Sequence, residues 1–423
     1  ILLFICSFLF PILYLLAKVN LFAFVSLAFA DYAFLFFIGR QPLVKRILDD
    51  RLSNGDENQV ILQVTNRMSY PLNMEIIDEM PEQLQLRNMS FKRYLASGKT
   101  CSIKYFVKPH ERGQYDFGNT NVYVSSMLGL LNRRYTLPTS LKVPVYPSYI
   151  QLKKHQLVTM NSMLKEHGGR RIRKVGQSME FEQIKEYVTG DDVRTLNWKA
   201  TARKGALMIN RFADEKSQQV YCIIDKGRLM KMPFNGLTLL DYAINSTLVM
   251  SHVCLQKQDR VGLITFAEKM GSVIAADRKP VQREHILEAL YRQQTAFLES
   301  DYEMLYMQLR RRVKQRSLII LYTNFESLYG LYRQLHYLRS IARHHLLLVV
   351  FFENTELVSL AHADAMNLED VYVKTTADKF VFEKKLIVKE LQKHGILSVL
   401  TAPENLTVNT VNKYLELKMK QAI

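Results

Sequence analysis

The sequence predicts an α/β domain with a mainly parallel sheet, preceded by a β-sandwich and by an apolar N-terminal segment. Three observations support this prediction. Apolar strand-like runs alternate with helical spacing after residue 219, short strands punctuated by Gly and Pro fill residues 41–148, and residues 1–38 are almost wholly apolar. Alternating strands and helices imply a parallel sheet covered on both faces, whereas closely spaced short strands with turn residues are typical of a sandwich.

Residues 1–40 are expected to form a transmembrane helical hairpin. Two apolar runs, residues 1–17 and 21–38, each approach the ~20 residues that cross a bilayer, and a short turn is expected around Lys18. Asp31 is costly within a span, so it should face the partner helix or lie near the interface. The basic cluster Arg40, Lys45, Arg46 and Arg51 follows the second run. By the positive-inside rule, this cluster places the C-terminal bulk of the chain in the cytoplasm.

Residues 41–148 are expected to be an immunoglobulin-like sandwich. Strands are expected at residues 58–66, 72–76, 102–107, 120–124 and 143–147, and residues 109–120 have the pattern strand, turn, strand. Residues 149–218 are expected to be a connector followed by a charged block. A helix is expected at 152–167, and 168–174 is a basic strip that is either a solvated face or a docking site for a partner or lipid.

Residues 219–423 should alternate between strand and helix. The apolar runs predict strands at 220–225, 260–266, 317–323, 346–352 and 396–400. Helices are expected at 237–255, 281–294, 302–313, 328–342, 358–366, 379–394 and from Glu404 onward. In an open sheet of this kind, ligands bind beyond the carboxyl ends of the strands. The residues after 225 and after 323 are therefore candidates for a site.

The charged block at residues 187–203 is the most informative stretch, because it surrounds the only tryptophan with two carboxylates and several basic groups. Gly190 supplies a turn, Asp191 can cap a helix that starts near Asp192, and Gly205 can end that helix. Acidic residues in the first turn and Lys199 and Arg203 in the last turn suit the helix dipole. Arg194 is expected to pair locally with Asp191 or Asp192. Catalysis by these two acids is the less favoured alternative.

Composition excludes several classes of protein. The formal net charge is +17, which suits lipid head groups or an acidic partner, and no nucleic-acid motif accompanies it. The four cysteines lack metal-site or disulfide spacing. No nucleophile elbow, phosphate loop, zinc-protease motif or dinucleotide fingerprint occurs. The sequence therefore predicts a protein that is not an enzyme and uses no cofactor.

The charged block resembles the signature of the bacterial domain-of-unknown-function family 58 (DUF58). Its positions are Tyr187, Gly190, Asp191, Asp192, Arg194, Trp198, Ala200, Ala202 and Arg203, while Asn197 stands where that family commonly has Asp. An arginine-glycine-x-tyrosine stretch like that at 112–115 also occurs in the family. The resemblance implies an inner-membrane adaptor without enzymatic activity. The implied partner is a MoxR-type AAA+ ATPase, and the implied role is assembly or maturation of envelope or other complexes.

Residues 219–400 resemble a von Willebrand factor A-like (Rossmann-like) domain. That family binds a metal through D-x-S-x-S after the first strand, with a Thr and an Asp from later loops. Here Asp225 is retained, but the other positions are Gly227, Leu229, Asp301 (beside Ser300) and Asn324 (after Thr323). Lys226 and Arg228 add positive charge that repels a cation. The resemblance therefore implies a degenerate site without metal, in which Asp225 pairs with a basic residue or caps the following turn.

Two other functions remain open from the sequence. One is metal-dependent adhesion, and the other is hydrolysis by the Asp191/Asp192 region. In the adaptor interpretation, Trp198 should be a buried anchor that packs the block against the α/β domain. Arg203 should face the cleft near Asp225 or a partner.

Overall fold

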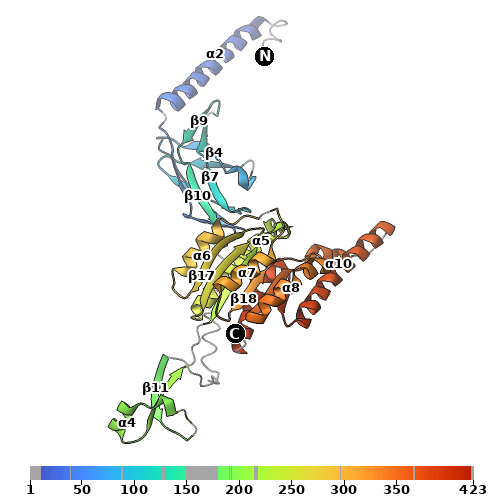
Figure 1. Cartoon of the computed structure of the whole chain (residues 1–423). Coiled ribbons are helices and arrows are strands. Elements are labelled where there is room, and N and C mark those ends of the chain that lie inside the picture. Colours follow the sequence, from blue (N-terminus) through green and yellow to red (C-terminus); the bar gives the residue numbers. More distant parts are fainter. Residues whose placement is uncertain are drawn as a thin grey trace. The chain divides into compact units, whose positions relative to one another are not determined.

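The computed structural model describes residues 11–38, 40–86, 89–125, 129–148, 180–189, 191, 193–213, 218–295, 297–364 and 367–420. The chain divides into two compact units, Ile1–Ile150 and Gln151–Ile423, and Figure 1 shows the elements of each. The helix predicted at 152–167 and the basic strip at 168–174, which form the connector, lie outside the described residues.

The N-terminal segment differs from the predicted hairpin. One helix, α2 (Pro11–Ala33), runs straight through Lys18 and continues as the short π-helix η1 (Phe34–Ile38). No Gly or Pro interrupts the chain at Lys18. The Lys18 ammonium instead lies 4.4 Å from the centre of the Tyr14 ring on the same helix, a cation–π contact. Residues Tyr14–Phe37 are long and apolar enough to cross a membrane. The described residues thus contain one candidate span, where two were expected.

The end of this helix is fastened to the sandwich. Asp31 is buried, and its Oδ2 accepts a hydrogen bond from the backbone N–H of Leu131 at 3.0 Å. Arg133 donates to the carbonyl of Leu35 at 2.7 Å and stacks on the Phe36 ring at 4.5 Å. A cation at a helix C-terminus satisfies carbonyls that lack a partner within the helix. Asp31 therefore faces the β-domain, not a second membrane helix.

The rest of unit 1 is a β-sandwich with one apolar core. Its sheets have the strand orders β1-β3-β6, β2-β10-β7 and β5-β4-β8-β9. The strands are β1 (Leu43–Ile47), β2 (Leu52–Ser53), β3 (Asn58–Thr65), β4 (Leu72–Asp78), β5 (Ser90–Leu95), β6 (Thr100–Val107), β7 (Gly113–Phe117), β8 (Thr120–Ser125), β9 (Asn132–Leu137) and β10 (Leu141–Tyr146). Buried and exposed residues alternate along β3 and β4, as expected for strands with one face on a core.

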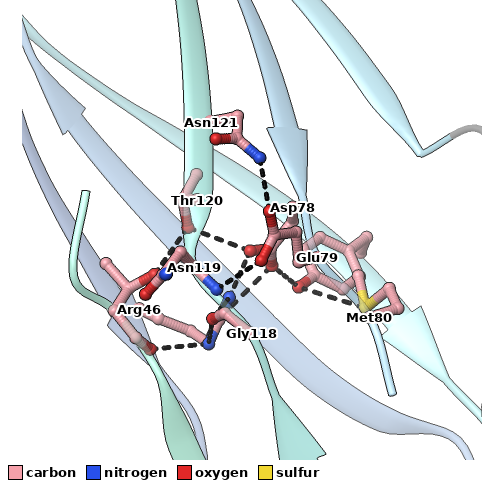
Figure 2. A network of polar contacts seen from close by, with 10 residues as sticks. Arg46, Asp78, Glu79, Met80, Gly118, Asn119, Thr120 and Asn121 are labelled. Atoms are coloured by element: carbon pink, nitrogen blue, oxygen red, sulfur yellow. Dashed lines mark hydrogen bonds and ion pairs between the residues drawn. The ribbon is translucent and has the colours of Figure 1, made fainter. Parts of the chain in front are cut away.

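A buried ion pair crosses this sandwich, and Figure 2 shows its network. The guanidinium of Arg46 binds the carboxylate of Asp78, and the two side chains are 2% and 0% exposed. Asp78 also accepts from the Thr120 hydroxyl at 2.9 Å and from the Tyr105 hydroxyl. Arg46 donates to the Thr139 carbonyl at 2.7 Å. The positive charge of Arg46 is therefore neutralised inside the domain. Arg46 does not add to the exposed basic charge on which the predicted cytoplasmic orientation depends.

The arginine-glycine-x-tyrosine stretch has a structural role in the sandwich. Gly113 begins β7 with φ 142, a conformation that favours glycine. Tyr115 is buried two residues later, and its hydroxyl donates to the Glu111 carbonyl at 3.0 Å. This bond ties the strand to the turn before it. The motif thus sets the entry of β7.

Unit 2 contains a six-stranded sheet of order β17-β16-β13-β18-β19-β20. Five strands are parallel and β17 is antiparallel at the edge. Numbered along the chain, the order is 3-2-1-4-5-6, which is that of a doubly wound fold. The strands are β13 (Gln219–Asp225), β16 (Arg260–Phe266), β17 (Met270–Asp277), β18 (Leu318–Tyr322), β19 (Leu346–Phe352) and β20 (Leu397–Thr401). A minor hairpin, β14 (Pro233–Phe234) and β15 (Leu237–Thr238), precedes the first helix.

Helices cover both faces of this sheet. The helices are α5 (Leu239–Gln256), α6 (Gln282–Tyr291), α7 (Tyr302–Arg312), α8 (Leu328–His344), α9 (Thr355–His362), α10 (Leu368–Lys393) and α11 (Leu406–Met419). Alternate residues of β13 enter two separate cores. Cys222 and Ile224 pack with α5, α6 and α11, while Tyr221 and Ile223 pack with α7, α8 and α10. The predicted mainly parallel sheet with two covered faces is therefore observed.

Strand β17 and helix α10 of unit 2 differ from expectation, and the short strands β14 and β15 were also not expected. Strand β17 was not predicted, because its residues are only partly buried and show no clear alternation. Helix α10 begins at Leu368, eleven positions before the predicted start. The reason is that Asn367 and Asp370 form a capping box there. The predicted short helix at 358–366 is α9, which Asn354 caps by accepting from the N–H groups of Glu356 and Leu357.

Candidate functional site

The charged block forms a small module of its own. Strands β11 (Glu180–Glu186) and β12 (Met208–Ala213) pair antiparallel, with the short helix α4 (Trp198–Lys204) between them. Asn197 caps α4 by accepting from the Ala200 N–H at 3.0 Å, and Gly205 ends it with φ 69. Asn and Asp both make this cap. The departure from the DUF58 pattern at Asn197 therefore keeps the same local function.

The acidic pair does not start the helix as predicted. Helix α4 begins at Trp198, after a 3-10 turn at Val193–Thr195. Asp191 instead accepts from the Lys185 ammonium at 2.9 Å and from the Val188 N–H at 3.1 Å. Asp191 therefore forms an ion pair with Lys185 and stabilises the turn that begins at Val188. Gly190, Asp192 and the side chain of Arg194 lie outside the described residues, so the expected pairing with Arg194 stays a prediction.

Trp198 is not the buried anchor that was predicted. Its side chain is 70% exposed, and none of the residues of α4 is buried. Lys199 and Arg203 are exposed beside it, and Tyr187 is half-buried, with its N–H bonded to the Leu207 carbonyl. Further exposed apolar side chains in the module are Ile184, Val188, Val193 and Leu207. The module is thus too small to bury its own tryptophan.

The second candidate site lies at the carboxyl edge of the six-stranded sheet. Asp225 ends β13 and is buried. Its carboxylate accepts from the Thr323 hydroxyl at 2.7 Å, the Tyr302 hydroxyl at 3.2 Å and the Ser300 hydroxyl. The Gly227 N–H adds a fourth hydrogen bond at 2.8 Å. Burial raises the pKa of Asp225, and these four hydrogen bonds oppose that rise. We call these five residues the Asp225 hub.

Gly227 is required by the hub. A Cβ at this position would lie 2.3 Å from the Ser300 oxygen and 3.1 Å from Asp225 Oδ1. A serine cannot therefore stand where D-x-S places one. Ser300 supplies that hydroxyl from the loop before α7. Gly227 departs from D-x-S because the Ser300 hydroxyl takes the place of the serine hydroxyl of that motif.

The other predicted ligand positions are engaged elsewhere. Asp301 caps α7 by accepting from the Met304 N–H at 2.9 Å, and Leu229 is partly buried in the wall of a cleft of about 250 Å³ beside Asp225. Arg228 lies 3.7 Å from Glu299, so it does not pair with Asp225 as one interpretation expected. Lys226 also makes no ion pair with Asp225 among the described residues. The alternative, in which Asp225 caps the following turn, is observed instead, because Asp225 accepts a hydrogen bond from the Gly227 N–H.

Asn324 is bound by a lysine that the sequence analysis did not single out. Its Oδ1 accepts from the Lys384 ammonium of α10 at 2.7 Å, and Lys384 also donates to the Phe325 carbonyl. Burial lowers the pKa of Lys384 to about 8, and Glu326 and Glu353 oppose this shift. No local pattern marks Lys384, because it lies sixty positions from Asn324.

The residues of the hub do not fit a Mg²⁺ ion. Magnesium prefers octahedral oxygen ligands with carboxylates among them, but the hub offers one carboxylate whose oxygens already accept four hydrogen bonds. The Tyr302 hydroxyl bonds both Asp225 and, at 2.7 Å, Thr323. The Tyr302 hydroxyl therefore links the Asp225 carboxylate to the Thr323 hydroxyl, the two groups that would have to bind a metal. Among the described residues, no cluster of three His, Cys, Asp or Glu side chains could hold a metal.

Comparison with known sequences supports the resemblance drawn from the charged block. Residues 183–382 match the family model described as "Protein of unknown function DUF58". The DUF58 match spans α4, the Asp225 hub and part of α10. The uncharacterized protein YeaD of Bacillus subtilis (strain 168) is 25% identical over 189 residues, which are 42% of this chain. The match spans 45% of YeaD, less than half of that relative.

Solved structures give more distant likenesses. The conserved hypothetical protein BatB from Bacteroides thetaiotaomicron is 13% identical, with a TM-score of 0.32 over 48% of this chain and 99% of that one. A CARDB domain from Pyrococcus furiosus is 12% identical, with a TM-score of 0.20 over 26% of this chain and 96% of that one. The likeness to DUF58 therefore rests on a sequence match over part of the chain, and the fold rests on the strand order described above.

We expect the α/β unit to bind Mg²⁺ weakly or not at all. Its hub oxygens are occupied by internal hydrogen bonds, so binding would have to break several of them. Isothermal calorimetry of the full chain in nanodiscs with MgCl₂ is the measurement. A dissociation constant at or below cellular free Mg²⁺ that disappears in Asp225→Ala would contradict this prediction.

The stability of the α/β unit should rise with pH above about 8. Lys384 has a pKa of about 8 in the fold against an ordinary value of 10.5. Between these two values the unfolded chain binds the extra proton, so unfolding becomes less favourable by at most about 1.4 kcal/mol per pH unit. Pulse proteolysis in urea at pH 7.5, 8.5 and 9.5 should show this rise in the wild type. Lys384→Met should lack it, and an equal pH slope in both proteins would refute the assignment.

Proposed function

We propose that this protein is an inner-membrane adaptor without enzymatic activity that works with a MoxR-type AAA+ ATPase in the assembly or maturation of envelope or other protein complexes. Helix α2 would anchor it, with the C-terminal bulk in the cytoplasm. The α/β unit would be a von Willebrand factor A-type domain whose metal site has been replaced by hydrogen bonds. The strand order and the place of Asp225 at the carboxyl edge of the sheet support this assignment.

The exposed tryptophan of the charged block is the observation that carries the proposal. An exposed Trp is unusual on a surface without a partner, and Trp is enriched at the centre of protein interfaces. Both ends of α4 are capped, so the side chain is presented on an ordered helix. Arg203 and Lys204 in the last turn add positive charge for an acidic partner surface. The arrangement fits docking better than catalysis, because Asp191 is held in a turn.

The chemistry at the hub gives no support to the other two functions. Metal-dependent adhesion needs a cation that bridges protein and ligand, and the donor set does not suit Mg²⁺. Hydrolysis by the acidic pair needs a carboxylate free to accept a proton in a cleft. Asp191 is instead committed to Lys185 and Val188.

Trp198→Ala should weaken binding of the MoxR-type ATPase of the same organism by at least tenfold. The basis is that central Trp residues at interfaces cost about 2 kcal/mol or more when truncated. Because Trp198 is 70% exposed, the same variant should change unfolding free energy by less than about 0.5 kcal/mol. Binding is measured with the full chain in nanodiscs and purified ATPase.

Tyr94→Ala is the matched control, since Tyr94 is 65% exposed on β5 of the other unit. It should leave both binding and stability unchanged. Two results would count against the adaptor model. One is wild-type affinity in Trp198→Ala, and the other is the absence of any ATPase binding by the wild type.

A further inference from the structure

An apolar pocket lies beside the Asp225 hub and is not used by the proposed function. It has a volume of about 270 Å³. Its walls come from the ends of β18 and β19, the starts of α5 and α9, and the middle of α10. The side chains that form its apolar surface are Met232, Pro233, Phe234, Leu239, Phe352, Leu357, Phe380 and Val381. Apolar walls with a few polar groups are typical of ligand sites, and this volume lies just below their usual range of about 300–1,000 Å³.

The charged groups of this pocket are three glutamates and one lysine. Glu326, Glu353 and Glu356 contribute to its lining, and Glu326 and Glu356 are exposed. The one cation is Lys384, whose ammonium is engaged by Asn324 Oδ1 and the Phe325 carbonyl. Three glutamates thus line a pocket whose one ammonium is already bonded within the protein. The pocket is an acidic place on a chain with a formal net charge of +17.

We propose that this pocket binds a bulky apolar side chain of a partner polypeptide that is flanked by Lys or Arg. The apolar group would enter between Phe352 and Phe380, and the flanking cations would meet the three glutamates. Charge complementarity of this kind sets which partner is accepted. An acidic or neutral segment of the same shape would lose that attraction. The inference does not depend on the ATPase, so it can stand if the adaptor model fails.

The test uses two short peptides of equal shape and opposite charge. Acetyl-Lys-Bpa-Lys-amide and acetyl-Glu-Bpa-Glu-amide carry the photoreactive residue benzoylphenylalanine in place of the apolar side chain. Each is cross-linked to the full chain in nanodiscs, and labelled positions are mapped by mass spectrometry. The cationic peptide should label the pocket residues at least fivefold more strongly than the anionic one. Acetyl-Lys-Phe-Lys-amide should compete for the label.

Glu326→Gln/Glu353→Gln should reduce labelling by the cationic peptide at least threefold. The peptide should not shift the Tm of this variant more than it shifts the Tm of the wild type. Glu284→Gln/Glu288→Gln on α6 is the matched control and should label like the wild type. Equal labelling by the two peptides, labelling outside the pocket, or an unchanged pattern in Glu326→Gln/Glu353→Gln would overturn the proposal. Pocket labelling without ATPase binding would reject only the adaptor model, and ATPase binding without pocket labelling would reject only this inference.

Discussion

Asp78→Ala should destabilise unit 1 by about 3–5 kcal/mol, because it leaves the buried guanidinium of Arg46 without its counter-charge. The side chains of both residues are almost wholly inaccessible to water. Glu79, the other carboxylate in Figure 2, accepts hydrogen bonds from Asn119 and Asn121. Tyr105 and Thr120 would also lose their acceptor. Burial is the main cause that raises the pKa of Tyr105, and it persists in Asp78→Ala, so the phenol is a poor substitute anion.

Hydrogen exchange followed by mass spectrometry measures this loss in the full chain. Amides of β4 and β8 should lose protection in Asp78→Ala, while those of β13 and β18 in unit 2 should not. Lys142→Ala is the control, because the Lys142–Asp116 pair is 3.6 Å long and its side chains are 70% and 62% exposed. Exposed pairs contribute about 0–1 kcal/mol. A loss below about 1 kcal/mol in Asp78→Ala would show that the buried pair is dispensable.

Asp225→Ala should cost the α/β unit about 3 kcal/mol or more. Three hydroxyls and one N–H lose their acceptor, and each buried donor left without a partner costs about 1–3 kcal/mol. The relief of an unfavourably buried carboxylate offsets part of this loss, as the raised pKa of Asp225 indicates. Asp225→Asn should lose less, since the amide oxygen still accepts.

The neighbouring carboxylate Asp301 provides the control for this experiment. Asp301 is exposed and caps α7, so Asp301→Ala should cost about 1 kcal/mol. Amide exchange in β13 and β18 gives both values in the same buffer without added metal. If Asp225→Ala and Asp301→Ala proved equal, the hub would not be a structural centre. Added MgCl₂ that stabilised the wild type but not Asp225→Asn would point to a metal site.

Four parallel strands of unit 2, β13, β16, β18 and β19, could be predicted within a residue or two because they are almost wholly buried. Continuous apolar runs such as those of β13 and β19 have no other stable place than the centre of a covered sheet. The half-buried edge strand β17 carries no such signal. In the first unit, hydropathy predicted the apolar segment but gave no information on a turn. The turn at Lys18 was an inference from one charged residue, which a helix accommodates easily.

The hub was only partly predictable because its members come from separate loops. Asp225 and Thr323 follow recognisable strands, so their meeting follows from the fold. Tyr302 and Ser300 could not be assigned, since their contact with Asp225 depends on how the loop before α7 folds. The exposure of Trp198 was missed for a different reason. A lone tryptophan in a sequence suggests a core, whereas the module around it has too few residues to enclose one.

The bonds from Asp31 and Arg133 set the height of the sandwich if α2 spans a bilayer. At 1.5 Å per residue, Asp31 lies about 26 Å along the axis from Tyr14, close to the roughly 30 Å thickness of the hydrocarbon layer. The turn at Leu131 that Asp31 holds would then sit among the lipid head groups. Helix α2 would then hold the sandwich in a fixed position at the membrane and would not act as a flexible tether. The start of β9 would then lie at the membrane surface, and a partner of this unit would bind at a fixed distance from the lipid.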